Sequence, residues 1–298
     1  MNVEIKAMTT RLVDNSFGQV TQSPLGEGLV KLEINHQHCQ AALSLYGGQV
    51  LSWQPEGERP VLWLSDSSAF QQGKAIRGGI PLCWPWFGAH PVDPNVGNHG
   101  FARQQNWQLT SVDVNAENVT VVLTWQGENI HPLWPTACRL SQTLVFGKSF
   151  TQCLTMDNLT DKAVDYTGAL HSYFRVSAPE NVAIVGFEQV AYDDKITDET
   201  GYGTDQLNGI GPVDRIYHTN STMKIKDDAW QRTLEVSSEH CQDWVFWNPG
   251  KTLAQTMADV HQGGEQEYVC LEAANTRIQK LPAQSSVSMK QKIRVLTC

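Results

Sequence analysis

The sequence predicts an all-β protein, built as one large antiparallel β-sandwich with few short helices. Three observations predict it. Hydrophobic residues recur with a period of two in many segments, helical periodicity is almost absent, and residues 1–298 contain no internal repeat and no Pro/Gly/Ser-rich linker. A single domain over the whole chain is therefore expected, with residues 1–25 peripheral to it. Because strands do not alternate with helices, a parallel doubly wound sheet is disfavoured.

The alternation is clearest in residues 118–126, where valine, leucine or tryptophan takes every second position, and in residues 286–295, where apolar residues alternate with Ser, Lys and Arg. Both patterns fit strands with one face on a core and the other in water. Similar alternation predicts strands at 30–35, 138–146, 151–158 and 222–226. The polar segment 158–165 is typical of a hairpin connection.

Helices and long loops are expected in only a few places. Short helices are predicted at 65–72 and 252–260. Residues 71–107, dense in Gly, Pro, Trp, Arg and His, and residues 192–213, rich in Asp, Thr and Gly, interrupt the strand pattern. Long irregular loops are uncommon in compact domains and are often functional. We therefore expect a sandwich scaffold that carries its functional groups on these two loops.

Composition limits the possible partners and compartments. The formal net charge of −9 gives the chain no general attraction for nucleic acid. An anionic small molecule remains possible where arginines are concentrated. The N-terminal sequence lacks the apolar run of a signal peptide, and no stretch approaches the ~20 apolar residues that span a bilayer. A cytoplasmic monomer without a membrane partner is expected, and the seven irregularly spaced cysteines fit buried thiols in a reducing compartment.

Sequence motifs for metals, nucleotides and nucleophilic serine are missing. The chain has no GxxxxGK[ST], HExxH, GxGxxG or GxSxG pattern and no cysteine–histidine cluster with zinc spacing. His36 and His38 would share one face of a strand, but without a third ligand a surface pair is the simpler interpretation. Neither a metal nor a cofactor is expected.

A polar face interrupts the apolar segment 168–176. Strand alternation would place Ala169, His171, Tyr173 and Arg175 together on this face. A titratable face within so apolar a run suggests function. The alternative is that His171 is a core histidine satisfied by hydrogen bonds.

A glutamate occurs inside the equally apolar segment 268–274. Glu272 would share its face with Tyr268 and Cys270. A buried carboxylate is costly unless it is paired or used in chemistry. The alternative is a glutamate at a strand end that reaches solvent. His171 and Glu272 could supply a general acid and a general base, although their separation in sequence does not show that they meet.

The irregular segment 77–103 contains Arg77, His99 and Arg103 among glycines and aromatic residues. Guanidinium groups suit phosphate oxygens, and glycines let the backbone approach a ligand closely. These arginines could instead tie the loop to backbone carbonyls. The aromatic residues could stack on a sugar or simply pack the loop.

Seven segments resemble the sequence blocks of the glucose-6-phosphate 1-epimerase family, the hexose-6-phosphate mutarotases within the wider aldose 1-epimerase group. They are RGGIPLCWPWFG (77–88), NHGFAR (98–103), LHSYFRV (170–176), VDRIY (213–217), WNP (247–249), MAD (257–259) and EYVCLEAA (267–274). The first and last blocks are fairly specific, whereas WNP and MAD mean little alone. The resemblance spans about residues 60 to 275, in the family's order.

The resemblance implies a sandwich of the galactose-mutarotase type with the sugar on one concave sheet face. It gives His171 the place of the general acid and Glu272 that of the general base. The implied substrate and phosphate contacts are Arg77, His99 and Arg103, and the implied sugar-hydroxyl contact is Asp214.

The expected function is therefore an isomerase of carbohydrate metabolism that interconverts the α- and β-anomers of a hexose 6-phosphate, with glucose 6-phosphate as the first candidate. An aldose 1-epimerase for unphosphorylated hexose would need the same acid–base pair without the arginines. A sugar-phosphate-binding protein without turnover would not need the pair. A glycoside hydrolase would require a second carboxylate, for which Asp193, Asp194 and Asp214 are candidates.

Overall fold

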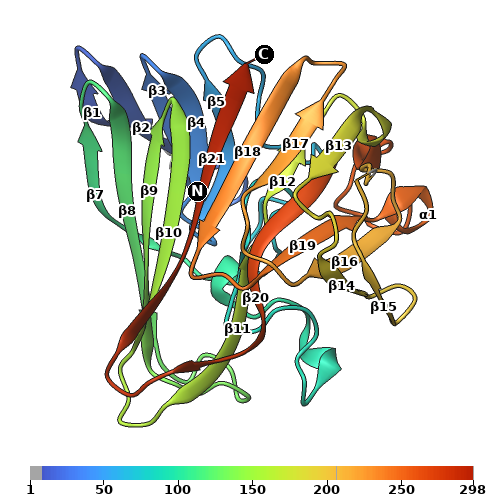
Figure 1. The fold of residues 1–298 in the computed structure, drawn as a ribbon. Coiled ribbons are helices and arrows are strands. Elements are labelled where there is room, and N and C mark those ends of the chain that lie inside the picture. The colour runs from blue at the N-terminus through green and yellow to red at the C-terminus, as the bar shows by residue number, and fades with distance from the viewer. Residues whose placement is uncertain (1–8, 206, 298) are drawn as a thin grey trace.

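The computed structural model describes residues 9–205 and 207–297, and antiparallel sheets account for most of them (Figure 1). The first sheet is a meander in which each strand pairs with the next along the chain. Its five strands are β1 (Thr10–Asn15), β2 (Gly18–Leu25), β3 (Leu29–His36), β4 (Cys39–Ser44) and β5 (Gln49–Pro55). β1 is an edge strand of this sheet, and Val20 of its neighbour β2 is fully buried.

The second sheet has eight strands in the order β13-β17-β18-β21-β10-β9-β8-β7. Its strands are β7 (Gln108–Val114), β8 (Asn118–Gly127), β9 (Cys138–Gly147), β10 (Ser149–Asn158), β13 (Val182–Val185), β17 (Met223–Asp227), β18 (Arg232–Glu239) and β21 (Ser286–Thr297). The strands predicted by alternation at 30–35, 118–126, 138–146, 151–158, 222–226 and 286–295 are confirmed within a few residues.

The third sheet follows the order β15-β14-β16-β19-β20-β11-β6, and β12 also pairs with β20. Its strands are β6 (Leu82–Cys83), β11 (Val164–Leu170), β12 (Tyr173–Arg175), β14 (Ala191–Asp194), β15 (Glu199–Tyr202), β16 (Val213–Tyr217), β19 (Asp243–Asn248) and β20 (Tyr268–Leu281). The predicted all-β antiparallel architecture is confirmed.

The main core contains apolar side chains from all three sheets. Leu32 of β3, Val121 of β8 and Leu271 of β20 belong to one continuous cluster, and each is fully buried. Burial of alternate residues along these strands is what generates the period of two in the sequence. The third sheet extends towards the right of Figure 1, where β14, β15, β16 and α1 lie.

Helix is scarce among the described residues, and none of these helices is long and apolar enough to cross a bilayer. They are α1 (Gly250–Ala254) and the 3-10 turns η1 (Pro94–Val96), η2 (Ala102–Gln104), η3 (Pro179–Asn181) and η4 (Gly264–Gln266). The helix predicted at 252–260 is therefore only α1, which ends at Ala254. The helix predicted at 65–72 is wrong, because the Phe70 carbonyl accepts from Glu27 N–H at 3.2 Å and Gln71 forms a bridge to Glu27.

Three further predictions need correction. Residues 168–176 are two strands, because β11 ends at Leu170 and β12 begins at Tyr173. Residues 158–165 form no hairpin, since they join β10 in the second sheet to β11 in the third. Residues 192–213 are not fully irregular, because β14 and β15 pair there as a hairpin.

The long segment 71–107 is mostly irregular, as predicted, with only β6, η1 and η2 in it. Two glycines hold it against neighbouring backbone. A Cβ on Gly79 would lie 2.0 Å from the Val50 carbonyl oxygen, and one on Gly100 would lie 2.0 Å from that of Trp84. Both also have a positive φ. Only glycine permits this combination of conformation and close approach.

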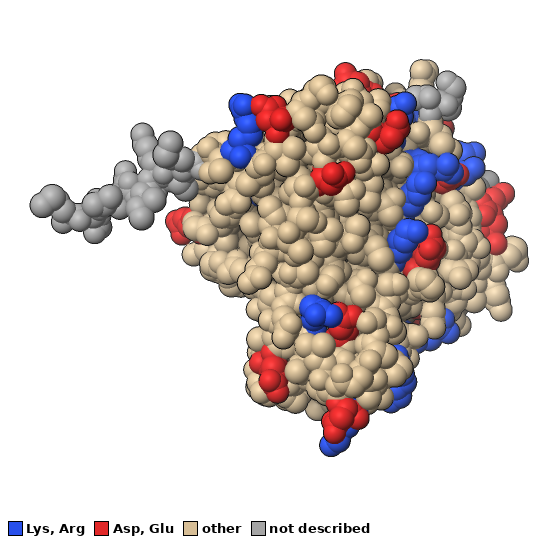
Figure 2. All heavy atoms as spheres, turned by 90° about the vertical axis from the view of Figure 1, so that its left-hand side faces the viewer, with Lys and Arg blue, Asp and Glu red and all other residues tan. Residues whose placement is uncertain are grey.

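Charge is spread thinly over the surface. On the face shown in Figure 2, basic and acidic side chains occur near one another across a mostly uncharged surface. Such a face creates no strong field of one sign. The arginines singled out from the sequence lie instead within a cavity beside the third sheet.

Candidate active site

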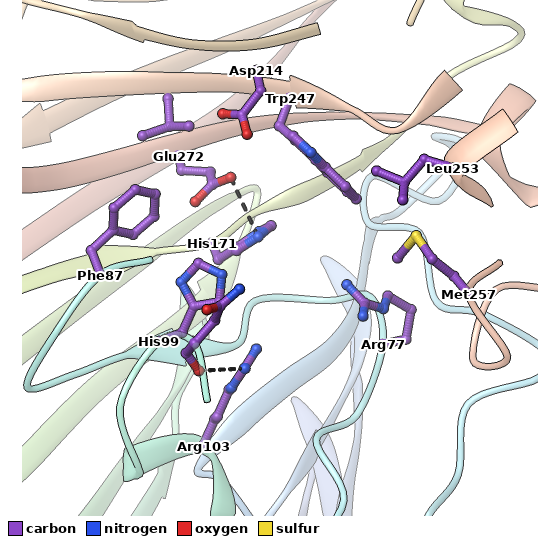
Figure 3. A pocket seen from close by; sticks show the side chains of 12 residues that line it. Arg77, Phe87, His99, Arg103, His171, Asp214, Trp247, Leu253, Met257 and Glu272 are labelled. Carbon is purple, nitrogen blue, oxygen red and sulfur yellow. Dashed lines mark hydrogen bonds and ion pairs between the residues drawn. The ribbon is translucent and has the colours of Figure 1, made fainter. Parts of the chain in front are cut away.

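The six residues singled out from the sequence line a single cavity of about 360 Å³ (Figure 3). The segment 71–107 contributes Arg77, His99 and Arg103, the break between β11 and β12 contributes His171, β16 contributes Asp214, and β20 contributes Glu272. Asn98, Phe87, Val245, Trp247, Leu253 and Met257 complete the lining. The convergence of His171 with Glu272, which the sequence left open, is therefore observed.

His171 lies where the strand breaks, with only 6% of its surface exposed. Its Nε2 is 3.4 Å from Oε1 of Glu272. Its Nδ1 is buried and has no hydrogen-bond partner among the described residues. A histidine satisfied by core hydrogen bonds would show the opposite pattern, so that alternative does not fit.

Glu272 is even more deeply placed, at 1% exposure in the middle of β20. Within the described part of the chain its Oε2 has no hydrogen-bond partner. The alternative of a glutamate reaching solvent at a strand end is therefore wrong. An unsatisfied carboxylate oxygen that faces a cavity is positioned to accept a proton from a ligand.

The environment of this pair favours uncharged side chains. Burial raises the pKa of Glu272 well above its usual range, Asp214 raises it further, and Arg103 opposes the shift. Burial lowers the pKa of His171 well below its usual range, and the positive charges of Arg77 and Arg103 act in the same direction. Both shifts favour the uncharged forms, a protonated Glu272 and a neutral His171. The imidazolium–carboxylate form of the pair is related to them by the transfer of one proton from Glu272 to His171.

His99 is held as a neutral hydrogen-bond donor. Its backbone has a φ of 70°, and its Nδ1 accepts a hydrogen bond from the Gly88 N–H at 3.1 Å. The ring proton must then be on Nε2. Burial lowers the pKa of His99 to about 3, and Arg103 and Arg77 contribute to the shift. His99 thus stays uncharged at neutral pH.

The two arginines are partly committed to the protein. Nε and Nη2 of Arg77 each lie 3.0 Å from Oδ2 of Asp259, and its Nη1 donates to the Tyr173 hydroxyl at 2.8 Å. Arg103 donates to the Asn98 carbonyl at 2.9 Å, and its Nε has no partner among the described residues. A guanidinium has five N–H donors, so both arginines keep unused donors. The loop-tying and anion-binding interpretations are therefore compatible.

Asp214 lies on the opposite side of the His171–Glu272 pair from the arginines (Figure 3). Burial raises the pKa of its carboxyl to about 6, with Asp194 adding to the shift and Lys195 opposing it. The cavity therefore has a cationic end and an acidic end. Of the aspartates considered for a hydrolase, Asp193 pairs with His218 and Asp194 with Arg215, and neither lines the cavity.

Sequence reasoning misjudged some neighbours. Arg175, predicted to share the face of His171, does not line the cavity and lies 3.6 Å from Glu267. Asp259 and Trp247 were noticed only as parts of the weak MAD and WNP segments. In the structure Trp247 lines the cavity and Asp259 binds Arg77. The WNP and MAD segments were therefore the sequence features that could have identified these two residues.

His171, Cys270 and Glu272 offer atoms within 4.8 Å of one another that could in principle bind a metal. Metal binding would require the thiolate of Cys270. Burial raises the pKa of this thiol well above its usual value, with Glu272 raising it further, and the residue packs in an aromatic cluster. The three residues therefore make a poor metal site.

Comparison with known proteins agrees with the geometry. The aldose 1-epimerase family model matches residues 30–294. The chain belongs to the aldose 1-epimerase family. This assignment accounts for the all-β fold.

Individual relatives extend the comparison. A protein of Escherichia coli K12 is 34% identical over 268 residues, covering 88% of this chain and 89% of that protein. One from Cenchrus ciliaris is 32% identical over 273 residues, covering 87% and 81%. Both are described as "putative glucose-6-phosphate 1-epimerase". A crystal structure of a "putative mutarotase" from Salmonella typhimurium superposes with a TM-score of 0.90 at 30% identity, covering 98% of this chain and 97% of that one.

Proposed function

We propose that this member of the aldose 1-epimerase family interconverts the α- and β-anomers of a hexose 6-phosphate, with glucose 6-phosphate as the first candidate. The observation that carries the proposal is the placement of two arginines in the same cavity as the His171–Glu272 pair. An enzyme for neutral sugars has no need of cationic groups at that position. The descriptions of the relatives point to the same substrate class.

Ring opening needs one proton removed and one supplied. Glu272, as carboxylate, takes the proton of the C1 hydroxyl while His171, as imidazolium, gives a proton to the ring oxygen. The C1–O5 bond breaks, and its electron pair stays on O5. The products are an open-chain aldehyde, a neutral His171 and a protonated Glu272. Rotation about C1–C2 presents the other face of the aldehyde, and the same two transfers in reverse close the ring.

The proton count of the pair fits this cycle. The uncharged forms that the two pKa shifts favour, a protonated Glu272 and a neutral His171, are the forms that accompany the open-chain aldehyde. The ring forms require the same proton on His171. A bound phosphate dianion would offset the positive charges of Arg77 and Arg103, which lower the pKa of His171. Phosphate binding would thereby favour the imidazolium that ring opening needs.

The charge distribution also orients the substrate. A 6-phosphate placed towards Arg77 and Arg103 leaves the other end of the sugar near Glu272 and Asp214 (Figure 3). Asp214 can accept a hydrogen bond from a sugar hydroxyl once it is ionised. Glucose 6-phosphate would then lie with its anionic end and its reacting carbon at different ends of one cavity.

Replacing Arg103 or Arg77 with alanine is expected to weaken binding of hexose 6-phosphate about ten- to hundredfold, while binding of the free hexose changes little. Charge-assisted hydrogen bonds are typically worth about 1.5–3 kcal/mol, which corresponds to that ratio. Titration calorimetry with both sugars measures the difference. Arg139→Ala is the control, because this arginine pairs with Asp157 on β10 and does not line the cavity. Equal weakening of both sugars would show that the two arginines act only on the fold.

The proposed activity is tested by exchange NMR on equilibrated sugars. Glucose 6-phosphate should show faster α/β exchange in the presence of the protein, and glucose and galactose should respond much less. Acceleration of the free sugars alone would favour an aldose 1-epimerase for unphosphorylated hexose. If no sugar exchanges faster, the cavity binds without turnover and the proposed function is wrong.

A further inference from the structure

The orientation of His171 is not explained by hydrogen bonds. A catalytic histidine is normally oriented by a hydrogen bond to the ring nitrogen that does not take part in the chemistry. Here Nδ1 of His171 is buried, and the residues that the structure describes provide no partner for it. Nε2 lies 3.4 Å from Oε1 of Glu272, which is long for a hydrogen bond. Packing must therefore fix the imidazole plane.

The packing partner is the side chain two residues further along the chain. The Tyr173 ring lies parallel to the imidazole of His171, with centroids 4.7 Å apart and planes 6° apart. His99 and Trp247 meet the imidazole edge-on, at 5.6 Å and 6.1 Å. Parallel stacking on one face and perpendicular rings beside it leave the imidazole little freedom to rotate.

Tyr173 is itself firmly held. It is 1% exposed and forms the first strand position after the break, paired with Cys270 of β20. Its ring packs against Trp63 at 5.8 Å and Tyr268 at 5.1 Å. A buried ring packed on two further aromatic side chains provides a rigid surface for His171.

The hydroxyl of the same side chain contacts the cationic end of the cavity. It accepts a hydrogen bond of 2.8 Å from Nη1 of Arg77, whose Nε and Nη2 are held by Asp259. The guanidinium is thus fixed from two directions, and two of its N–H donors are left unused. Tyr173 therefore contacts the acid through its ring and the phosphate-binding arginine through its hydroxyl.

We propose that Tyr173 is a positioning residue for both ends of the reaction, orienting the imidazole of His171 by stacking and the guanidinium of Arg77 by its hydroxyl. The proposal rests on the proposed function and adds to it a residue that contacts no reacting atom. Its two roles reside in different atoms of one side chain, so two substitutions can separate them.

The test compares Tyr173→Phe with Tyr173→Leu by exchange NMR over a range of sugar concentrations. Phenylalanine keeps the stacked ring and removes the contact with Arg77. We expect KM for glucose 6-phosphate to rise about two- to tenfold, as the loss of one hydrogen bond allows, with a much smaller change in kcat. Leucine also removes the stacking, and kcat should fall about ten- to hundredfold, because small misplacements of a catalytic group cost that much.

Tyr217→Phe is the matched control. This tyrosine is fully buried and stacked on Phe187, its hydroxyl has no partner among the described residues, and it does not line the cavity. Its removal should change neither KM nor kcat. Thermal unfolding of each variant checks that the fold persists. Equal KM and kcat for wild type and Tyr173→Phe, or an unchanged kcat in Tyr173→Leu, would overturn the proposal.

Failure of the Tyr173 proposal can be distinguished from failure of the proposed function. If the wild type accelerates only free hexoses, the phosphate assignment fails, yet the kcat of Tyr173→Leu on those hexoses still tests the stacking role. If the wild type accelerates the anomer exchange of no sugar, the affinity for inorganic phosphate, measured by calorimetry, still tests whether the Tyr173 hydroxyl orients Arg77. Tyr173→Phe should then bind phosphate more weakly than Tyr217→Phe, and equal affinity would contradict the proposal.

Discussion

Glu272→Gln is expected to lower turnover of glucose 6-phosphate by about 10²- to 10⁴-fold, the range that a positioned general base typically contributes. Glutamine preserves the size of the side chain and its place in β20 but cannot take the C1 proton. The loss should appear in kcat, because the substituted group does not bind the phosphate. Exchange NMR at saturating glucose 6-phosphate measures it, and a turnover close to wild type would exclude Glu272 as the base.

The same substitution is expected to stabilise the fold. Burial raises the pKa of Glu272, so the folded protein keeps this proton at pH values where the unfolded chain has lost it. The free energy of unfolding therefore falls as pH rises above the ordinary titration range of a glutamate, about pH 4.3. Glutamine carries no such penalty. Its stabilising effect in urea unfolding should grow from about pH 5 to about pH 8.

Glu239→Gln is the control for both effects. Glu239 lies on the surface at the end of β18 and pairs with Lys290 at 2.8 Å. The hydrogen bond and the charge of Lys290 lower the pKa of Glu239. Its substitution should therefore neither lower turnover nor bring a stability gain that grows with pH. A loss of activity without a gain in stability in Glu272→Gln would show that the carboxyl is better solvated than its burial implies.

The strands could be predicted because every second residue of a strand with one buried face is apolar. Val119, Val121 and Leu123 are fully buried in β8, and the period of two follows directly from their burial. The helix expected at 65–72 was wrong because a pairing with Glu27, about forty residues earlier, uses the backbone there. Turn-forming composition located the bend at 158–165 but carried no information on which sheet the next strand joins.

Part of the candidate site could be predicted, because burying a titratable side chain in an apolar segment costs free energy. A histidine and a glutamate inside apolar segments demand an explanation, and both proved to be buried and incompletely hydrogen-bonded. The role of Tyr173 could not be predicted in this way. Its hydroxyl meets Arg77, 96 residues away, and Arg77 meets Asp259, 182 residues away. A tyrosine in an apolar strand is common in any β-protein, so its role in the site can be inferred only once its contacts are known.

His171→Asn is expected to lower kcat by about 10²- to 10⁴-fold as well, since asparagine can donate a hydrogen bond but cannot carry the proton to the ring oxygen. The control is His36→Asn. His36, predicted to belong to a surface pair, is buried instead, and its Nε2 contacts the Asn115 carbonyl at 2.9 Å outside the cavity. This substitution should leave turnover unchanged. Exchange NMR again provides the measurement, and near-normal turnover in His171→Asn would exclude His171 as the acid.

The double variant His171→Asn/Glu272→Gln decides whether the two residues act in the same step. Groups that act as a unit show strongly non-additive losses, because removing one partner already abolishes the step that both perform. In the mechanism above, every proton taken by Glu272 is matched by one that His171 gives. The double variant should therefore be scarcely slower than the slower single variant. If the fold-losses in turnover of the two single variants multiply in the double variant, the two groups act in separate steps. The mechanism in which both transfers occur together would then be wrong, even if each residue is essential.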